Sequence, residues 1–139
     1  MRLDWGPRGA HELVAGGAEV VVVVDVLSFT TSVTVAVSQG TVVRPRSWSA
    51  ASRPVPAEEV DAVYALGRAA AAPGQISLSP ASIVAAAPPE RLVLPSPNGS
   101  AICEQLAAEG VTVVAASLRN ARAVGRWLSG QQAAVGIVA

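Results

Sequence analysis

Five consecutive valines, Val20–Val24, constrain the fold of this chain more than any other feature. A half-buried strand alternates apolar and polar residues, whereas an unbroken apolar run is typical of a strand covered on both faces. The run therefore predicts a central strand of a parallel sheet over Val20–Val26. Asp25 lies where this strand runs out, and a carboxylate beside buried valines needs a partner such as a cation, an arginine or backbone amides.

Hydroxyl-bearing residues follow Asp25 at the start of a segment that is predicted to be a helix. They are Ser28, Thr30 and Thr31. A strand, a carboxylate, a loop of hydroxyls and a helix together form the layout of an anion site or a metal–anion site at the carboxyl end of a parallel sheet. The alternative interpretation is that these residues only cap the helix, which stabilises it by about 1 kcal/mol.

The order of strand, polar elbow and helix occurs three times in the chain. The second unit is Arg91–Leu94, Pro95–Ser100 and Ala101–Glu109, and the third is Val111–Ala116, Ser117–Asn120 and Ala121–Leu128. Right-handed crossovers bring the carboxyl ends of parallel strands to the same edge of a sheet. The sequence therefore predicts that Asp25, Asn98 and Arg119 converge, although three separate helix caps would explain each elbow singly.

The remaining elements are assigned from breaks in the apolar pattern at proline and glycine. Helices are predicted over Ala10–Ala15, from Phe29 to Val37 with Phe29, Val33 and Val37 as the buried row, and over Ala81–Ala87. A further helix is predicted to begin at Pro56 and to end at Pro73-Gly74, with an apolar face formed by Val60, Val63, Tyr64 and Gly67. Extended segments are predicted over Thr41–Arg44, stopped at Pro45, and over Ile76–Pro80 and Ala133–Val138, with a loop over Arg46–Pro56.

Composition limits the class of protein and the chemistry. The chain has 139 residues, 51% of them apolar and 14% charged, which predicts one α/β domain with a buried core rather than disorder. Ten basic residues balance ten acidic ones, so nothing favours binding to nucleic acid or to a membrane surface. All ten basic residues are arginines, which excludes lysine chemistry such as a P-loop lysine or a Schiff base.

Two reactive residue types occur only once each. Cys103 is alone, so neither an intrachain disulfide nor a cysteine zinc cluster can form, and its place on a helical face favours core packing. His11 is interpreted as a surface residue rather than a catalyst. Met1–Ala10 lacks the apolar region of a signal peptide, and the valine run is far shorter than the ~20 residues of a membrane span. We therefore expect a cytoplasmic protein.

Four segments, taken together and in this order, resemble the 2-phosphosulfolactate phosphatase (ComB-like) family: Val21–Thr31, Ser77–Ser82, Leu92–Ser100 and Ser117–Ala121. The resemblance implies a three-layer α/β/α fold with a mostly parallel sheet. It also implies Mg²⁺-dependent hydrolysis of a phosphate monoester of a small hydroxy acid. In the best-known members of that family the product is sulfolactate, on the route to coenzyme M.

A phosphatase of this kind gives each elbow residue an expected role. Asp25 is the expected Mg²⁺ ligand. Asp25 and Arg119 are the expected catalytic residues, with Arg119 neutralising the charge that develops on the phosphoryl group. The expected substrate-binding residues are Ser28, Thr30, Thr31, Ser79, Asn98, Gly99, Ser100 and Asn120.

The chain departs from the family pattern at charged positions. Family members commonly carry arginine where Ser28 and Ala101 stand, and often an acidic residue where Arg68 follows Gly67. Arg68 and Arg119 are candidates to replace part of the missing positive charge. The alternative is a relative that binds phosphate or a metabolite and has lost catalysis.

The family also continues past a strand like Ala133–Ala139 into further helices, so the chain is expected to correspond to the N-terminal part of such a domain. An apolar final strand without a following crossover would leave an uncovered edge or face. Exposed apolar strand surface promotes association, and small α/β enzymes are commonly dimers. The sequence therefore predicts a homo-oligomer with Gln131–Ala139 at or near the contact.

Overall fold

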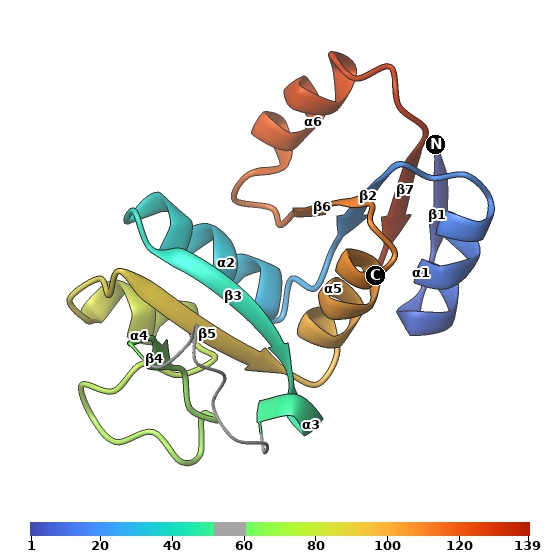
Figure 1. Cartoon of the computed structure of the whole chain (residues 1–139). Coiled ribbons are helices and arrows are strands. Elements are labelled where there is room, and N and C mark those ends of the chain that lie inside the picture. Colours follow the sequence, from blue (N-terminus) through green and yellow to red (C-terminus); the bar gives the residue numbers. More distant parts are fainter. Residues whose placement is uncertain (52–60) are drawn as a thin grey trace.

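The computed structural model describes residues 1–51 and 61–139, and its elements are labelled in Figure 1. The strands are β1 (Arg2–Asp4), β2 (Val20–Val23), β3 (Val42–Ser47), β4 (Val63–Tyr64), β5 (Arg91–Ser96), β6 (Thr112–Ala115) and β7 (Val135–Val138). The helices are α1 (Gly6–Ala15), α2 (Phe29–Ser38), α3 (Trp48–Ala51), α4 (Pro80–Ala85), α5 (Gly99–Ala108) and α6 (Ala121–Ser129). The described strands pair in parallel, so the predicted α/β class is confirmed.

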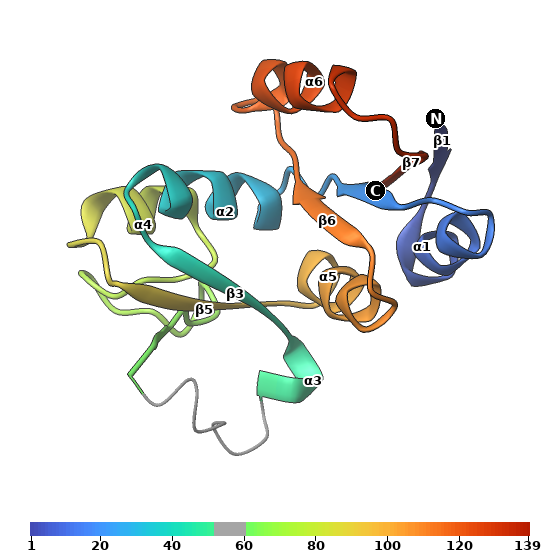
Figure 2. The ribbon, with the colours of Figure 1, turned by 45° about the horizontal axis from the view of Figure 1, so that its top comes forward.

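The described strands form two parallel sheets flanked by helices, as Figures 1 and 2 show, in agreement with the expected three-layer α/β/α fold. The order is β1-β7-β2-β6 in the four-stranded sheet and β3-β5-β4 in the three-stranded sheet. Strand β2 therefore lies inside its sheet, as the valine run predicted. The division into two sheets was not predicted, because the pattern within a strand does not say which strand is its neighbour.

Burial on both faces explains why β2 has no alternation. Val21 and Val23 belong to the main hydrophobic core, and Val20 and Val22 lie on the opposite face of the strand. All four side chains are at most 4% exposed. Burying a valine side chain stabilises the fold by about 1.5–3 kcal/mol, so a polar residue at any of these positions would be costly.

Helix α5 connects the two sheets and lies between them in Figure 1. It packs against β3 and β5 of the smaller sheet and against β2 and β6 of the larger one. Its predicted apolar face is confirmed, because Ile102, Cys103 and Leu106 are buried. This helix therefore sets how strand ends from different sheets approach one another.

Helix α2 confirms the helix predicted after Asp25 but buries a different face. Phe29 is buried as expected, whereas Val33 is only partly buried and Val37 is 56% exposed. The predicted apolar row holds at Phe29 and in part at Val33, which packs against the core, and is wrong at Val37, because α2 also packs against α4 and β3 through another side. That side includes the buried Thr34, whose hydroxyl donates to the Thr31 carbonyl at 2.8 Å. This hydrogen bond satisfies the hydroxyl group, so a polar residue is tolerated at a buried position.

The strand that was expected to stop at Pro45 continues through it to Ser47. Within the described sheet β3 is an edge strand that pairs with β5 alone, and proline is tolerated where its nitrogen faces away from the neighbouring strand. The loop predicted over Arg46–Pro56 is therefore wrong at its start, where β3 ends and α3 begins. Residues 52–60 of that loop lie outside the described part of the chain.

The helix predicted from Pro56 to Pro73-Gly74 is wrong over its described part, which begins at residue 61. Val63 and Tyr64 form β4, and Leu66 makes a parallel bridge to Ser77. Val63, which the predicted helix placed on its apolar face, is 41% exposed. The first part of the predicted helix, residues 56–60, lies outside the described residues.

Strand β7 confirms the strand predicted over Ala133–Val138, but both of its edges are paired. Strand β1 joins it on one side and β2 on the other. The premise of a final strand without a continuing sheet is wrong, because β1 has only three residues and went undetected in the sequence. A homo-oligomer stays a prediction, which light scattering at micromolar concentration tests.

The longest helices in the described part of the chain are α1, α2 and α5, with ten residues each. A helix of that length spans about 15 Å, whereas the hydrocarbon core of a bilayer is about 30 Å thick. Among the residues described, no helix is long and apolar enough to cross a membrane.

Candidate functional site

The structure brings the first two elbows together at Asp25. The carboxylate oxygen Oδ2 of Asp25 accepts a hydrogen bond from the backbone N–H of Gly99 at 3.1 Å. Gly99 is the first residue of α5, so the carboxylate lies at the positive end of a ten-residue helix. This amide and the helix end are the backbone partners that a carboxylate next to β2 requires.

Gly99 is required at this contact because there is no space for a side chain. A Cβ atom built on Gly99 would lie 2.2 Å from Cδ1 of Phe29 and 2.8 Å from Oδ2 of Asp25. Both distances are shorter than any ordinary van der Waals contact. The Asn98-Gly99 pair therefore permits a close approach of backbone to carboxylate rather than forming a hairpin turn.

Two of the predicted substrate-binding hydroxyls hold the loop after β2 in place. The backbone N–H of Asp25 donates to Oγ1 of Thr30 at 3.2 Å, and the N–H of Thr30 donates to the Asp25 carbonyl at 2.9 Å. Oγ1 of Thr31 donates to the carbonyl of Val26 at 2.8 Å. Thr30 is fully buried, so its hydroxyl fixes the backbone of Asp25 from behind.

Two hollows flank Asp25. The first has a volume of about 480 Å³ and is lined by Asp25, Leu27, Ser28, Trp48, Gly67, Arg68, Leu78, Ser96, Pro97 and Asn98. The second, of about 510 Å³, is lined by Gly6, Pro7, Val23, Val24, Asp25, Val26, Leu27, Asn98, Gly99, Ile102 and Ala139. Asp25, Leu27 and Asn98 line both hollows, which makes this carboxylate accessible from two sides. The first hollow is also lined by a positively charged side chain, that of Arg68, and we take this hollow as the candidate site.

Arg68 is the residue that brings positive charge into the first hollow. Its Nη2 donates to Oγ of Ser28 at 2.5 Å, and its Nε donates to the carbonyl of Leu78 at 2.9 Å. The hydroxyl of Ser28 donates in turn to the same Leu78 carbonyl at 2.8 Å. A guanidinium therefore stands beside the elbow residue that follows Asp25, although it comes from a segment about 40 residues further along the chain.

The third elbow does not supply its polar groups to either hollow. The guanidinium of Arg119 donates to the carbonyl of Thr34 and to Oγ of Ser38, both at 3.1 Å. Thr34 lies one helical turn beyond Thr30 on α2, so Arg119 contacts the later part of that helix rather than the Asp25 loop. The sequence predicted that Arg119 and Asp25 would meet at one edge of a single sheet. In the structure Arg119 contacts α2 instead.

Three other predicted binding residues are also directed elsewhere. Oδ1 of Asn120 accepts from the N–H of Ser117 at 2.8 Å, and its Nδ2 donates to the Ala115 carbonyl at 3.0 Å. The buried hydroxyl of Ser100 donates to the carbonyl of Leu94 at 2.7 Å. Ser79 stands at the N-cap of α4 without a side-chain capping bond. None of the three lines the two hollows around Asp25.

Several residues of the first hollow were not selected from the sequence. Trp48 and Leu78 lay in segments interpreted as a loop and a short extended stretch; Leu78 falls within the family-like segment Ser77–Ser82, whereas Trp48 belongs to no motif. Ser96 lies in the second elbow, where its Oγ accepts from the N–H of Asn98 at 3.4 Å. The hydroxyl-rich character of that elbow was a usable signal for Ser96, whereas the position of Trp48 depends on where β3 ends.

Asp25 is the candidate ligand for a metal ion. Among the described residues no group of three or more His, Cys, Asp or Glu side chains gathers in one place. Oδ2 of Asp25 is bonded to Gly99, and within that same part of the chain Oδ1 has no hydrogen-bond partner. The side chain of Asn98 is likewise without one. One carboxylate oxygen and one amide oxygen fit the hard-oxygen preference of Mg²⁺, which keeps several waters and takes few protein ligands.

Cys103 records the electrostatics of this region from the protein interior. Burial, then the nearby Asp25 carboxylate, then Glu104 raise the pKa of its thiol from 9.0 to about 12. A thiol with this pKa stays protonated and unreactive at neutral pH. The prediction that Cys103 packs in the core is confirmed.

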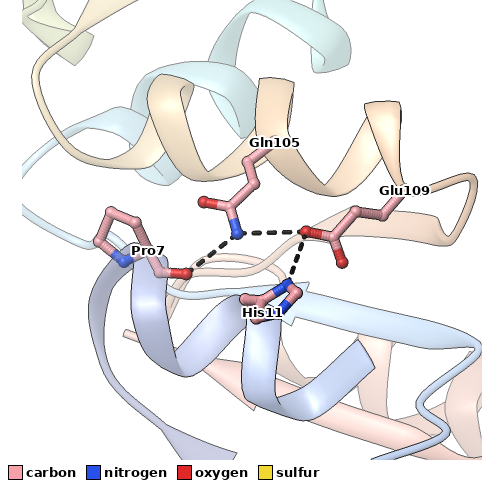
Figure 3. Close-up of polar contacts among 4 residues, drawn as sticks. All are labelled: Pro7, His11, Gln105 and Glu109. Carbon is pink, nitrogen blue, oxygen red and sulfur yellow. Dashed lines mark hydrogen bonds and ion pairs between the residues drawn. The ribbon is translucent and has the colours of Figure 1, made fainter. Parts of the chain in front are cut away.

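His11 lies away from the Asp25 hollows, on α1 where it faces α5 (Figure 3). Its Nδ1 is 3.5 Å from Oε1 of Glu109, and Nε2 of Gln105 donates to the same oxygen at 3.2 Å and to the Pro7 carbonyl at 3.0 Å. The His11 side chain is 64% exposed. These contacts link two helices at the surface and agree with the interpretation of His11 as a surface residue.

Parallel strands flanked by helices, with a carboxylate held by a helix N-terminus and an arginine in the same hollow, define an α/β protein with a site suited to an anionic ligand. A family model described as 2-phosphosulpholactate phosphatase matches residues 10–139. The chain therefore belongs to the 2-phosphosulpholactate phosphatase family, as the four sequence segments indicated. Comparison with curated proteins gives no match, and neither does comparison with solved structures.

Proposed function

We propose that the protein is a Mg²⁺-dependent phosphatase that hydrolyses a phosphate monoester of a small hydroxy acid similar to 2-phosphosulfolactate. The observation that carries the proposal is the contact between Asp25 and Gly99 at the wall of a hollow that also holds Arg68. The oxygen of water bonds to phosphorus, the bond between phosphorus and the ester oxygen breaks, and a proton from water passes to the departing oxygen, which gives the alcohol and inorganic phosphate. Membership of a phosphatase family supports this reaction class.

The residues of the hollow have complementary tasks in this proposal. Asp25, with the amide oxygen of Asn98, would hold Mg²⁺. When bound, the ion neutralises phosphoryl oxygens and lowers the pKa of a coordinated water. The Gly99 amide keeps the Asp25 carboxylate in one orientation, and the Thr30 contacts fix its backbone. Such preorganisation matters because uncatalysed hydrolysis of phosphate monoesters is extremely slow.

The size of the hollow supports a small substrate. Pockets for small ligands have volumes of about 300–1,000 Å³, and the first hollow has about 480 Å³. Leu27, Trp48 and Leu78 give it apolar walls, whereas charged and polar groups lie at Asp25, Arg68 and Asn98. A phosphorylated acid with a short carbon chain fits this size and this mixture of charged and apolar walls.

A non-catalytic phosphate-binding protein is the second candidate function. The observation that favours it is that Asp25 is the one carboxylate lining the first hollow in the described part of the chain. General acid–base chemistry on an ester oxygen usually engages a second titratable side chain. In that case the pocket would bind phosphate but would not catalyse hydrolysis of a phosphate ester.

One assay separates the two functions. Phosphate release is measured from a panel of phosphorylated hydroxy acids, with Mg²⁺ and with EDTA. The phosphatase proposal expects turnover that requires Mg²⁺, whereas the binding protein gives no turnover but a higher melting temperature with inorganic phosphate. A ligand at 100 times its Kd stabilises the folded state by about 2.7 kcal/mol, which a melting curve detects easily. Absence of Mg²⁺-dependent release from every ester would refute the phosphatase proposal.

A further inference from the structure

We propose that Arg68 binds an oxyanionic group of the ligand, so that the cation of the Asp25 site comes from the segment after β4 rather than from the elbow after β2. This inference rests on the proposed function for the identity of the ligand. It goes further by assigning one side chain as the determinant of anion binding.

The location of Arg68 is the first argument. Arg68 lines the same hollow as Asp25 and Asn98. Its guanidinium contacts Ser28, which follows the proposed metal ligand Asp25 by three residues. No other arginine lines this hollow in the described part of the chain. Arg119, the cation expected from the sequence, is bonded to the later part of α2.

The bonding of the guanidinium is the second argument. Nε and Nη2 are held by the Leu78 carbonyl and the Ser28 hydroxyl, both neutral acceptors. Within the residues described, Arg68 has no carboxylate partner, and its Nη1 makes no hydrogen bond. An arginine that is oriented by neutral groups keeps both its full charge and free donors for a ligand, and its planar fork matches phosphate and carboxylate geometry.

The residues just before Arg68 are anchored to the neighbouring segment. The N–H of Leu66 donates to the carbonyl of Ile76 at 2.9 Å, and the N–H of Leu78 donates to the carbonyl of Leu66 at 3.1 Å. Gly67 faces the Trp48 ring, and a Cβ built on it would lie 3.4 Å from the ring, at ordinary van der Waals contact. This anchoring places the guanidinium before a ligand arrives, which reduces the entropy lost on binding.

The small side chain of Ser28 makes this arrangement possible. Ser28 is buried, and its hydroxyl donates to Leu78 while it accepts from Arg68. A long cation at position 28 would occupy the space that the Arg68 guanidinium takes. One positive charge at this wall can thus be supplied from either position, and the chain supplies it from position 68.

Binding of inorganic phosphate, measured by calorimetry in the presence of Mg²⁺, tests the inference directly. We expect Arg68→Gln to weaken phosphate binding at least tenfold, whereas Arg126→Ala, which removes an exposed arginine of α6, leaves it unchanged. Far-ultraviolet circular dichroism and melting curves verify that each variant is folded. Equal phosphate affinity in a folded Arg68→Gln variant and the wild type overturns the inference.

A variant in which the positive charge is moved to another position distinguishes the role of the charge from any role of Arg68 in holding its segment in place. Arg68→Ser removes the cation, and Ser28→Arg combined with Arg68→Ser returns it from the opposite position. We expect the double variant to regain phosphate affinity to within about threefold of the wild type. A folded double variant that binds phosphate no better than Arg68→Ser overturns the inference.

Two esters identify which oxyanion Arg68 contacts. Phospholactate carries a carboxylate in addition to its phosphoryl group, and propyl phosphate has the phosphoryl group alone. A higher KM for both esters in Arg68→Gln assigns the contact to the phosphoryl group, whereas a higher KM for phospholactate alone assigns it to the second acid. An unchanged KM for both contradicts the inference. If neither ester is hydrolysed, the phosphatase proposal fails, and the phosphate-binding measurements still decide the role of Arg68.

Discussion

The elbows after β5 and β6 look alike in sequence but do different work in the structure. The elbow after β5 donates the Gly99 amide to Asp25 and leaves the side chain of Asn98 beside both hollows. The elbow after β6 uses the side chain of Asn120 on its own backbone and that of Arg119 on α2. One elbow therefore builds a candidate site, and the other holds the fold together.

The sheet assignments make this difference instructive. Strands β2 and β6 are neighbours in one sheet, yet the elbow that meets Asp25 follows β5 of the other sheet. Helix α5 packs between the two sheets and brings its N-terminus to Asp25, whereas α6 has no buried residue. Packing of the following helix, rather than adjacency of the strand, decides which elbow reaches the carboxylate.

The largest effect is expected from Asp25→Asn. The change keeps the shape of the side chain and the contact with Gly99 but removes the charge that binds Mg²⁺. We expect a loss of kcat/KM of about 100-fold or more and the disappearance of Mg²⁺ dependence, because the charge stabilisation of the transition state is removed. Steady-state kinetics at varied Mg²⁺ measures this, and unchanged turnover would exclude Asp25 as the ligand.

Gly99→Ala tests the close approach at the β5 elbow. The new Cβ must displace Phe29 and the Asp25 carboxylate, so we expect a loss of about 1–3 kcal/mol in the free energy of unfolding together with lower activity. Gly125→Ala in α6 is the matched control, because the new Cβ would meet nothing within 4 Å and the substitution replaces a glycine inside a helix. It should stabilise the protein by about 0.5–1 kcal/mol. Urea unfolding of both variants gives the comparison, and equal effects would contradict it.

Asn98→Ala and Asn120→Ala should separate the two elbows by what they change. Removing Asn120 leaves the Ser117 N–H and the Ala115 carbonyl without their partner, which should destabilise the fold by about 1–3 kcal/mol while KM stays near the wild-type value. Removing Asn98 should raise KM about tenfold and change stability by less than about 0.5 kcal/mol. Thermal melts and kinetics on both proteins test this crossing of effects. Two variants with the same profile would show that the elbows are equivalent.

Arg119→Ala is expected to give the smallest change. Two hydrogen bonds to α2 are lost from an exposed side chain, so the free energy of unfolding should fall by about 1 kcal/mol. We expect phosphate affinity to stay within about twofold of the wild type, because the guanidinium contacts α2 and not the Asp25 loop. Calorimetry decides the point. A tenfold loss of phosphate binding would restore the catalytic role predicted for Arg119 from the sequence.

The sequence by itself determined the local features of this protein. The valine run fixed β2 as an interior strand, since alternation is absent only where both faces are covered. The order of strand, elbow and helix predicted the α/β class, and the position of Asp25 at the end of the run predicted its need for a partner. These features depend on neighbours along the chain, which the sequence states directly.

Only the tertiary structure decided which distant groups meet. The amide of Gly99 reaches Asp25 across 74 positions, and Arg68 reaches Ser28 across 40. Both contacts depend on two sheets held apart by α5 and on a β4 segment that helical spacing had concealed. Contacts of this kind result from packing among surfaces that are far apart in sequence, so neither periodicity nor composition specifies them. The sequence alone indicated a site at Asp25. Folding brings the Asp25 carboxylate and the Arg68 guanidinium into one hollow.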